Sequence, residues 1–256
     1  MLRATLNAVY VVVAREMIKF MREKGKLVST LARPLLWLFL VGGGMSRLVS
    51  PDMGIPYTQF IFPGIIGMTI LFSSIFSSIS IIWDKEFGFM KEMLVAPVPR
   101  FSIVIGKALS GTLVSTVQAL LIVLLYPLLG LDLSVSQILL IALVSVLLSF
   151  CISSLGILIA TFYESFESFS VIMNFIVMPM FFLSGAMYPV KLLPPILEIF
   201  SRINPLTYGI DALKYMVFPE KRFLTHDFPL SLDIGVIVVA SVVFVSLGAL
   251  VFERRK

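Results

Sequence analysis

Long apolar runs separated by short polar segments dominate this chain. Each run is continuous over about 20 residues and lacks the every-second-residue alternation of a half-buried strand. A helix needs about 20 apolar residues to cross a bilayer, and only helices and closed barrels satisfy their backbone hydrogen bonds there. The pattern predicts an all-α membrane protein with six transmembrane helices, at about residues 29–49, 60–83, 103–129, 136–162, 168–188 and 232–252.

Residues 1–26 precede the first run and have a different period. Apolar residues recur there at spacings of three and four, beside a separate basic row. The apolar positions are Leu6, Val9, Val13, Met17 and Phe20, and the basic ones are Arg15, Lys19 and Arg22. This pattern predicts an amphipathic helix that lies in the membrane surface. A signal peptide carries its basic residues only before its apolar core, so that interpretation is excluded.

Composition and charge agree with a membrane protein. The chain is 59% hydrophobic and 14% charged, with a net charge of +5, whereas soluble domains have about 25% charged residues. Six spans place 1–28, 84–102, 163–167 and 253–256 on the same side, and these regions together hold most of the basic residues, although 163–167 holds none. Because cytoplasmic loops of membrane proteins are rich in Lys and Arg, both termini are predicted to be inside. The excess charge therefore indicates topology and lipid headgroups, and no nucleic-acid partner is expected.

The usual residues of energy-coupling or catalytic chemistry are missing. Gly106-Lys107-Ala108 resembles the end of a P-loop, but Ala108 replaces the hydroxyl that binds magnesium. The central parts of the six runs hold no ionisable residue of the kind that relays protons. Cys151 is the single cysteine, so no intrachain disulfide can form. His226 is the single histidine and has no second His or Cys with which to make a metal site. We therefore expect no catalytic, cofactor or metal site on this chain. The protein must then either be passive or take its energy from a partner.

One short charged segment, "WDKEFGFMKEMLVAPVPR" at residues 83–100, interrupts the apolar pattern. Asp84 is predicted to cap a helix that begins near Lys85, and Pro97 to end it. Its apolar side is Phe87, Met90 and Leu94, and its polar residues are Glu86, Lys91 and Glu92. The helix either docks on a cytoplasmic protein or lies among the headgroups, and both interpretations remain open.

The segment 189–231 is predicted to lie outside, between the last two spans. It holds two amphipathic helices too short to cross, at about Pro195–Ile203 and Leu206–Val217, separated by Asn204-Pro205. They either pack in the outer leaflet or take part in gating.

Serines form a small polar face on the second span. They are Ser73, Ser74, Ser77, Ser78 and Ser80. Small hydroxyl residues allow close helix packing, and the alternative is a substrate pathway shared with the fifth span. On the fourth span Ser145, Ser149 and Ser153 recur every fourth residue, which favours packing.

The chain resembles the ABC-2 type export permeases over nearly its whole length. Residues 83–100 are similar to their coupling helix through Lys85-Glu86, Gly88, Glu92-Met93-Leu94, Pro97 and Arg100. The order of three further segments adds to the resemblance: "QFIFPGIIGMTILF", "FLSGAMYPVKLLP" and "INPLTYGIDALKYM". Members of this family include drug-resistance, polysaccharide and nodulation-factor exporters.

The resemblance implies a single transmembrane domain over residues 1–256. It also implies a homodimer that associates with two copies of a separate ATPase subunit, which would bind ATP and magnesium. The assembly would export a lipid-linked, glycan or amphipathic drug-like substrate across a cytoplasmic membrane, in a prokaryote, by alternating access. The permease itself would not be an enzyme, and membrane lipids would be its other partners.

Three groups of candidate functional residues follow. The predicted ATPase-partner interface comprises Lys85, Glu86, Phe87, Gly88, Met90, Lys91, Glu92, Leu94, Arg15 and Glu16. The predicted substrate pathway comprises Ser73, Ser77, Ser80, Asn174, Met178, Phe181 and Phe182. The predicted external gate comprises Tyr188, Asn204, Pro205 and Tyr208. A passive channel or lipid scramblase, or a membrane anchor for a cytoplasmic protein, are the alternative functions.

Overall fold

The computed structural model describes residues 2–22, 24–46, 55–89, 95, 99–220 and 226–254. All secondary structure in these ranges is helical, which confirms the predicted all-α class. The elements are α1 (Leu2–Arg22), α2 (Lys24–Leu36), η1 (Trp37–Gly42), α4 (Tyr57–Glu86), α6 (Arg100–Val123), η2 (Tyr126–Leu129), α7 (Val135–Phe162), α8 (Phe166–Ile172), η3 (Met173–Val177), α9 (Met178–Phe182), η4 (Val190–Leu192), α10 (Pro195–Ile203), α11 (Pro205–Val217) and α13 (Leu230–Arg254).

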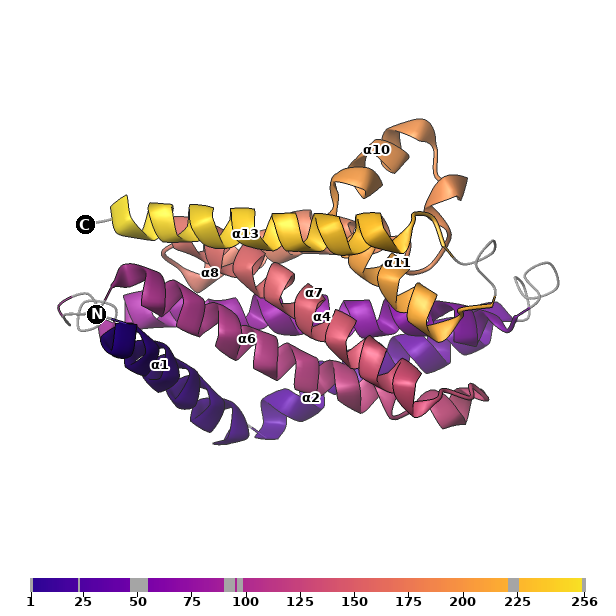
Figure 1. Ribbon diagram of the computed structural model, residues 1–256, viewed down its shortest axis with the longest axis horizontal. Helices are drawn as coiled ribbons and strands as arrows, with labels where there is room; N and C mark the ends of the chain where they lie inside the picture. The colour runs from indigo at the N-terminus through magenta and orange to yellow at the C-terminus, as the bar shows by residue number, and fades with distance from the viewer. Residues whose placement is uncertain are drawn as a thin grey trace.

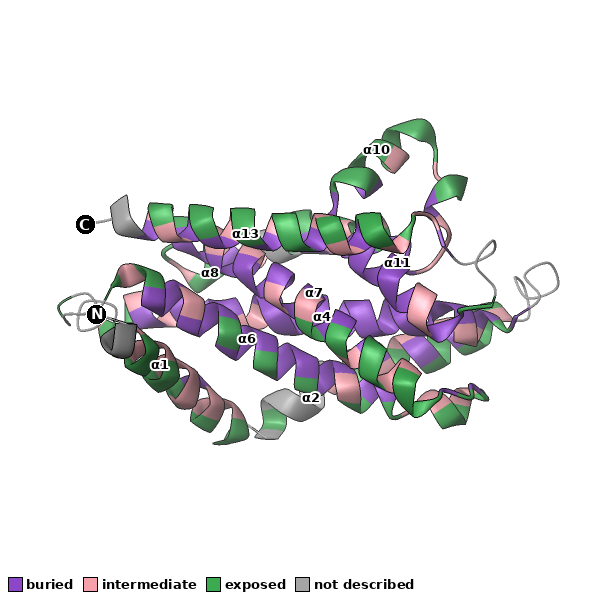
Figure 2. Ribbon diagram, viewed as in Figure 1, coloured by how far each residue is buried: buried purple, intermediate pink, exposed green. Residues whose placement is uncertain are grey.

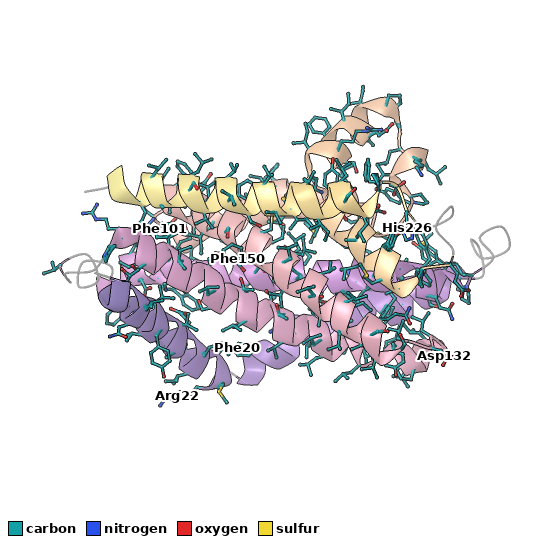
Figure 3. The ribbon with its side chains drawn as sticks, viewed as in Figure 1. Phe20, Arg22, Phe101, Asp132, Phe150 and His226 are labelled. Atoms are coloured by element: carbon teal, nitrogen blue, oxygen red, sulfur yellow. The ribbon has the colours of Figure 1, made fainter. Side chains whose placement is uncertain are left out.

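The long helices α4, α6, α7 and α13 form an elongated bundle (Figure 1). Helix α1 begins, α6 begins and α13 ends at one end of the bundle, which we call the α1 end. Helices α10 and α11 lie toward the opposite end, which we call the α11 end. The labelled residues Phe101 and His226 mark the two ends in Figure 3.

Four helices are long and apolar enough to cross a membrane: Tyr57–Glu86, Arg100–Val123, Val135–Phe162 and Leu230–Phe252. The predicted first and fifth spans correspond to shorter apolar helices, Leu31–Ser46 and Phe166–Phe182. The count of six spans and the inside position of both termini therefore stay predictions. The predicted third span corresponds to α6, which ends at Val123 and not at the predicted residue 129. A 3-10 turn that contains Pro127 follows, because proline cannot donate the next helical hydrogen bond.

Helix α4 is the core of the bundle, and α13 is at its periphery. In α4, 89% of the most apolar window is buried inside the protein, against 22% in α13 (Figure 2). The outward side of α13 is nevertheless apolar, with Val239 and Val242 more than half exposed. Such a surface is costly in water but not in lipid, which agrees with a bundle immersed in a bilayer.

Candidate functional site

Helix α1 packs directly on α6. A Cβ atom on Gly106 would lie 2.8 Å from the Cβ of Val12, so only glycine permits this approach. The inward side of α1 also carries the buried Glu16, whereas Leu6, predicted to be on its apolar side, is 60% exposed. The face of α1 that meets the protein is thus partly acidic, and apolar side chains such as Tyr10 point away from it.

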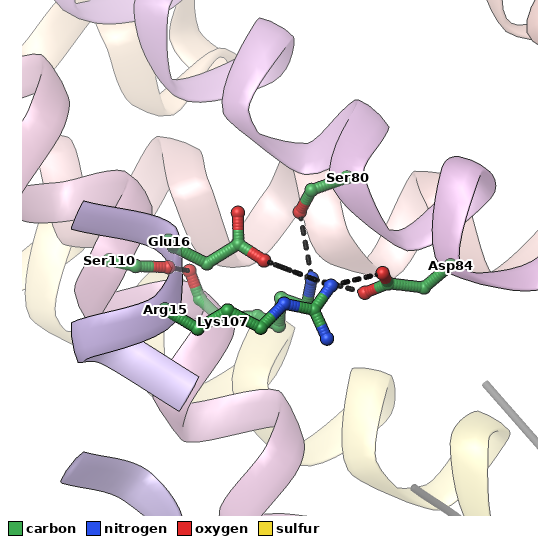
Figure 4. A network of polar contacts seen from close by, with 6 residues as sticks. All are labelled: Arg15, Glu16, Ser80, Asp84, Lys107 and Ser110. Carbon is green, nitrogen blue, oxygen red and sulfur yellow. Dashed lines mark hydrogen bonds and ion pairs between the residues drawn. The ribbon is translucent and has the colours of Figure 1, made fainter. Parts of the chain in front are cut away.

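Four charged residues join α1 to α4 and α6, and we call them the ion clamp (Figure 4). They are Arg15 and Glu16 of α1, Asp84 of α4 and Lys107 of α6. The Lys107 ammonium donates to Glu16 Oε1 at 2.7 Å, to Asp84 Oδ2 at 2.5 Å and to Ser80 Oγ at 3.0 Å. The Arg15 guanidinium donates to the other carboxylate oxygen of Asp84 and lies 3.8 Å from Glu16 Oε1.

The ion clamp is buried and electrically balanced. The side chains of Lys107 and Asp84 are only 3% and 5% exposed. Burying an unpaired charge costs several kcal/mol, but two cations here compensate two carboxylates, and every short contact is a charge-assisted hydrogen bond. The arrangement therefore fixes α1 against the ends of α4 and α6 that lie on either side of residues 87–99.

The prediction that Asp84 caps a separate helix was wrong. Helix α4 continues without a break to Glu86, so Asp84 lies in its last turn. Its carboxylate is occupied by Lys107 and Arg15 instead of by backbone N–H groups. The sequence could not show this, because the two partners are 23 and 69 residues away.

Lys85 ties the same turn to a further helix. Its ammonium donates to the carbonyl oxygens of Ala160, Thr161 and Tyr163 at 3.0–3.1 Å. Carbonyl groups at a helix C-terminus lack intrahelical partners and favour a nearby cation. Lys85, predicted to face a partner, thus holds the ends of α4 and α7 together within the chain.

Beyond this anchored turn the chain exposes two aromatic side chains. Phe87 is 70% exposed and Phe89 is 50% exposed, and Glu86 beside them is exposed as well. Gly88 between them has a φ of +82°, a left-handed conformation that side chains with a Cβ disfavour. The other members of the predicted partner interface after this turn, Met90, Lys91, Glu92 and Leu94, lie outside the described residues.

Some serines of α4 serve helix packing. Ser74 Oγ donates to the carbonyl of Ser149 on α7 at 3.5 Å. Gly111 of α6 leaves room for two further hydroxyls, since a Cβ there would lie 2.8 Å from Ser153 Oγ and 3.4 Å from Ser77 Oγ. These contacts support the packing interpretation for the fourth-span serines.

The serines of α4 that were predicted to line a pathway open onto a crevice between α1, α4 and α6. Its empty space is about 510 Å³, including its open side. The residues that line it are Glu16, Lys19, Phe20, Ser73, Phe76, Ser77, Ser80, Trp83, Val114 and Gln118. None of these comes from α8, η3 or α9, so within one chain the crevice does not unite the two halves of the predicted pathway.

The fifth-span candidates have varied surroundings. Asn174 is exposed and Phe182 is 39% exposed. Phe181 is buried against Trp37, with ring centroids 5.9 Å apart. Met178 is partly buried against the main core. Their role in a pathway stays a prediction.

Gln118 is a crevice residue that the sequence analysis did not select. It lies in α6 and is only 1% exposed. A buried amide within an apolar span is costly unless it is paired. That signal was present in the sequence, but Gln118 is a single polar residue, whereas the serines of α4 recur at helical spacing.

The predicted external-gate residues link α9 to α10 and α11. Asn204 donates to the Met180 carbonyl at 2.7 Å and accepts from the N–H of Leu206 at 3.1 Å, just before Pro205 opens α11. The Tyr188 hydroxyl donates to the Phe182 carbonyl at 2.6 Å. The Tyr208 hydroxyl donates to the Arg202 carbonyl at 2.7 Å. Asn204, Tyr188 and Tyr208 thus each have a bracing contact, Pro205 begins α11, and gating by the four residues stays a prediction.

Two charged residues inside α11, missed by the sequence analysis, form an outer latch that we define as Asp211 and Lys214. Asp211 accepts from the N–H groups of Asp227 and Phe228 at 3.0 and 2.9 Å. Lys214 donates to the Gly185 carbonyl at 2.7 Å. Burial raises the pKa of Asp211 and lowers the pKa of Lys214. Their i, i+3 spacing inside an amphipathic helix was the available signal.

The comparisons with known proteins agree with this architecture. Residues 7–218 match the ABC-2 type transporter family. The transport permease ycf38 of Cyanophora paradoxa is 30% identical over 259 residues, covering 97% of this chain and 89% of its own. The inner membrane transport permease YadH of Escherichia coli (strain K12) is 30% identical over 237 residues, covering 90% and 89%.

A third relative is named for nodulation and not for transport. Nodulation protein J of Rhizobium meliloti (strain 1021) is 26% identical over 239 residues, which cover 90% of this chain and 86% of its own. The matched family region includes α4, α6, α7 and α11 together with both charged clusters on them. On the extent of that match and on the 30% identity over most of two transport permeases, the chain belongs to the ABC-2 type transporter family.

Proposed function

We propose that this chain is the transmembrane permease subunit of an ATP-binding cassette exporter that a separate ATPase subunit drives. The observation that carries the proposal is the turn at Phe87–Phe89, which exposes two aromatic rings directly beyond the ion clamp. Exposed aromatic side chains beside polar residues are typical of protein interfaces. Here they lie at the α1 end, which we propose faces the ATP-containing side of the membrane.

The anchoring of this turn suggests how force reaches the spans. Asp84 connects it to α1 and α6 through the ion clamp, and Lys85 connects it to the end of α7. A partner that pushes on Phe87 would therefore move the four helices α1, α4, α6 and α7 together. Such a rigid-body shift is what alternating access requires, because a small displacement at one site is transmitted through packed elements.

The proposed assembly is a homodimer of this chain, folded as one domain over residues 1–256, with two ATPase subunits in a cytoplasmic membrane. ATP and magnesium would bind only to those subunits. The substrate we propose is a lipid-linked, glycan or amphipathic molecule, a class that the apolar bundle favours. A prokaryotic source stays a prediction.

The chain alone is expected to show no ATP hydrolysis. Gly106-Lys107-Ala108 lies within α6, and its lysine is committed to the ion clamp, so it offers no phosphate cradle. Phosphate release should be measured from purified permease, from the ATPase and from their complex. Hydrolysis that the permease alone sustains, and that survives removal of contaminants, would contradict the division of labour; release unchanged by adding permease to its ATPase would favour an anchor or a passive channel.

Replacing Phe87 by Ala is expected to weaken ATPase capture by about 2 kcal/mol, or roughly 30-fold in Kd, because truncated aromatic anchors at interfaces typically cost this much. The folded bundle should be unaffected, since Phe87 is 70% exposed. Binding of the ATPase to immobilised permease measures the effect. The matched control is Leu128→Ala, which removes an equally exposed apolar side chain at the α11 end. Equal affinities of parent and Phe87→Ala would make this turn a headgroup contact only.

A further inference from the structure

The crevice between α1, α4 and α6 continues from the ion clamp toward the middle of the bundle. Ser80, Ser77 and Ser73 follow one another on successive turns of α4. At 1.5 Å per residue they cover about 10 Å. Ser80 accepts a hydrogen bond from Lys107 at one end. Gln118, which also lines the crevice, lies about 27 Å along α6 from Arg100.

Polar atoms on the wall of this crevice have no partner in the protein. Ser73 Oγ and Gln118 Oε1 are buried and make no hydrogen bond, and the two residues are 3% and 1% exposed. Leaving a buried polar atom unpaired costs about 1–3 kcal/mol. Both residues line the same crevice, so these two atoms are available to a molecule with hydrogen-bonding groups that enters it.

The mouth of the crevice is cationic. The Lys19 ammonium lies 4.3 Å from the ring centroid of Trp83, and Arg22 is exposed one turn further along α1. The charges of Arg15 and Lys107, by contrast, are compensated by Asp84 and Glu16 within the ion clamp. Among the described residues that line the crevice, Lys19 is therefore the cation that faces an anion at the mouth.

The walls of the crevice are apolar, and one side of it is open. Phe20, Phe76 and Val114 contribute these walls. Phe76 and Ser77 are only partly buried, although the residues on either side of them along α4 are buried. A cationic mouth, a polar floor and apolar walls match a molecule that has an anionic head and an apolar tail.

We infer that this crevice is a laterally open track for the phosphate-bearing head of an amphiphile whose tail stays in the bilayer. Lys19 binds the phosphate at the mouth. The hydroxyls of Ser77 and Ser73 and the amide of Gln118 replace water along the floor. The inference deepens the proposed function by naming a substrate class. It rests on that function only for the ATP-derived energy that moves the head along the crevice toward the middle of the bundle.

The crevice is narrow in this structure. About 30 Å³ of its space is wide enough for a water-sized group, which is room for one or two water molecules. Lys19 and Phe20 both belong to α1, so movement of α1 sets the width. Because Glu16 joins α1 to Lys107 of α6, and Arg15 joins it to Asp84, a push on the turn at Phe87 changes the position of the head-binding residues.

The first test asks whether the crevice is hydrated. Cys151 is the chain's single cysteine, and Cys151→Ser gives a background for Ser77→Cys and, on the outward side of α13, Val243→Cys, whose parent residue is 44% exposed. A charged methanethiosulfonate reagent, applied in dodecyl maltoside micelles, reacts only where water reaches the thiol. We expect Ser77→Cys to react at least about tenfold faster than Val243→Cys. Equal or slower reaction at position 77 overturns the inference.

The second test asks what occupies the crevice. Lysophosphatidylglycerol should slow the labelling of Ser77→Cys several-fold, and Lys19→Gln should abolish most of that protection. Glycerol 3-phosphate, a head without a tail, and an equal addition of neutral dodecyl maltoside should give none. Protection by the neutral detergent would mean apolar covering only, and full protection by glycerol phosphate would mean a site for free phosphate; either result, or no protection at all, overturns the amphiphile track.

These measurements need no ATPase, so they are independent of the exporter proposal, which the ATPase-capture experiment with Phe87→Ala addresses. Gln118→Leu adds an arm that joins the two. It should leave protection at Ser77→Cys intact and reduce ATP-driven transport of a fluorescent phosphatidylglycerol by the complex at least about fivefold. Unchanged transport would contradict the inner half of the track. Loss of both transport and protection would indicate that the variant is misfolded. Labelling of Val243→Cys in the Gln118→Leu background at the same rate as without that substitution checks that the bundle is folded.

Discussion

Replacing Lys107 by Met is expected to destabilise the protein by about 3–5 kcal/mol, because it leaves the carboxylates of Glu16 and Asp84 buried with one partly exposed cation between them. Met keeps most of the apolar stem, so the change reports on charge. The buried thiol of Cys151 provides the measurement: a thiol-reactive fluorophore labels it only when the bundle opens, and the midpoint of labelling against temperature should fall.

Two further variants show whether this loss comes from the ion clamp. In the double variant Glu16→Gln, Lys107→Met, one charge of each sign is removed, and Asp84 keeps Arg15, so we expect part of the stability to return. Arg202→Met is the surface control. The Arg202 side chain, which pairs with Glu198, is 59% exposed, and such surface ion pairs contribute little to stability. Lys107→Met with the parent's labelling midpoint, or a double variant less stable than the single one, would contradict the clamp.

Replacing Asp211 by Ala is expected to open the outer latch, at a cost of about 2–4 kcal/mol. The substitution leaves the N–H groups of the partly buried Asp227 and Phe228 without their acceptor, and an unsatisfied group costs about 1–3 kcal/mol when it is buried. It also removes a nearby negative charge from the buried Lys214. Hydrogen exchange at the amides of 227 and 228 should accelerate before the rest of the bundle is affected.

Asp132 supplies the control for the outer latch. It is an exposed aspartate at the same end of the bundle (Figure 3), and Asp132→Ala should change neither exchange nor unfolding. Asp211→Asn keeps an oxygen acceptor without the charge and should therefore lie between the parent and Asp211→Ala. If all three variants exchange at the parent's rate, the hydrogen bonds of Asp211 contribute nothing to closing the outer segment.

Short helices with strong boundary signals were predictable from sequence. The helix expected at Pro195–Ile203 is observed as α10 with those bounds, since Pro195 suits the first turn and Asn204-Pro205 starts a new helix. Helix α11 begins one residue earlier than predicted, at Pro205. In both cases the signal is local, because proline and an asparagine cap act within a few residues.

The candidate site was predictable only in part. Ser73, Ser77 and Ser80 were selected for their spacing, and they do share one crevice, but its other walls come from α1 and α6 and not from the fifth span. Lys85 was selected as a partner contact and instead binds the end of α7. A side chain with several donors takes whichever acceptors the fold brings near, and its identity alone does not name them.

The sequence by itself determined that this protein is a helical membrane protein, because apolar run length against bilayer thickness and the local rules of helix ends require no knowledge of distant contacts. Its resemblance in motif order, together with the family match over residues 7–218, identified the ABC-2 type transporter family. Only the tertiary structure decided which charged side chains are paired inside the protein. Lys107 meets Glu16 across 91 residues of chain, and Asp211 meets residues beyond the end of its own helix. Such pairs form because a charge buried by packing must find an opposite charge or a backbone dipole nearby, and which one is nearby depends on how the helices pack in three dimensions.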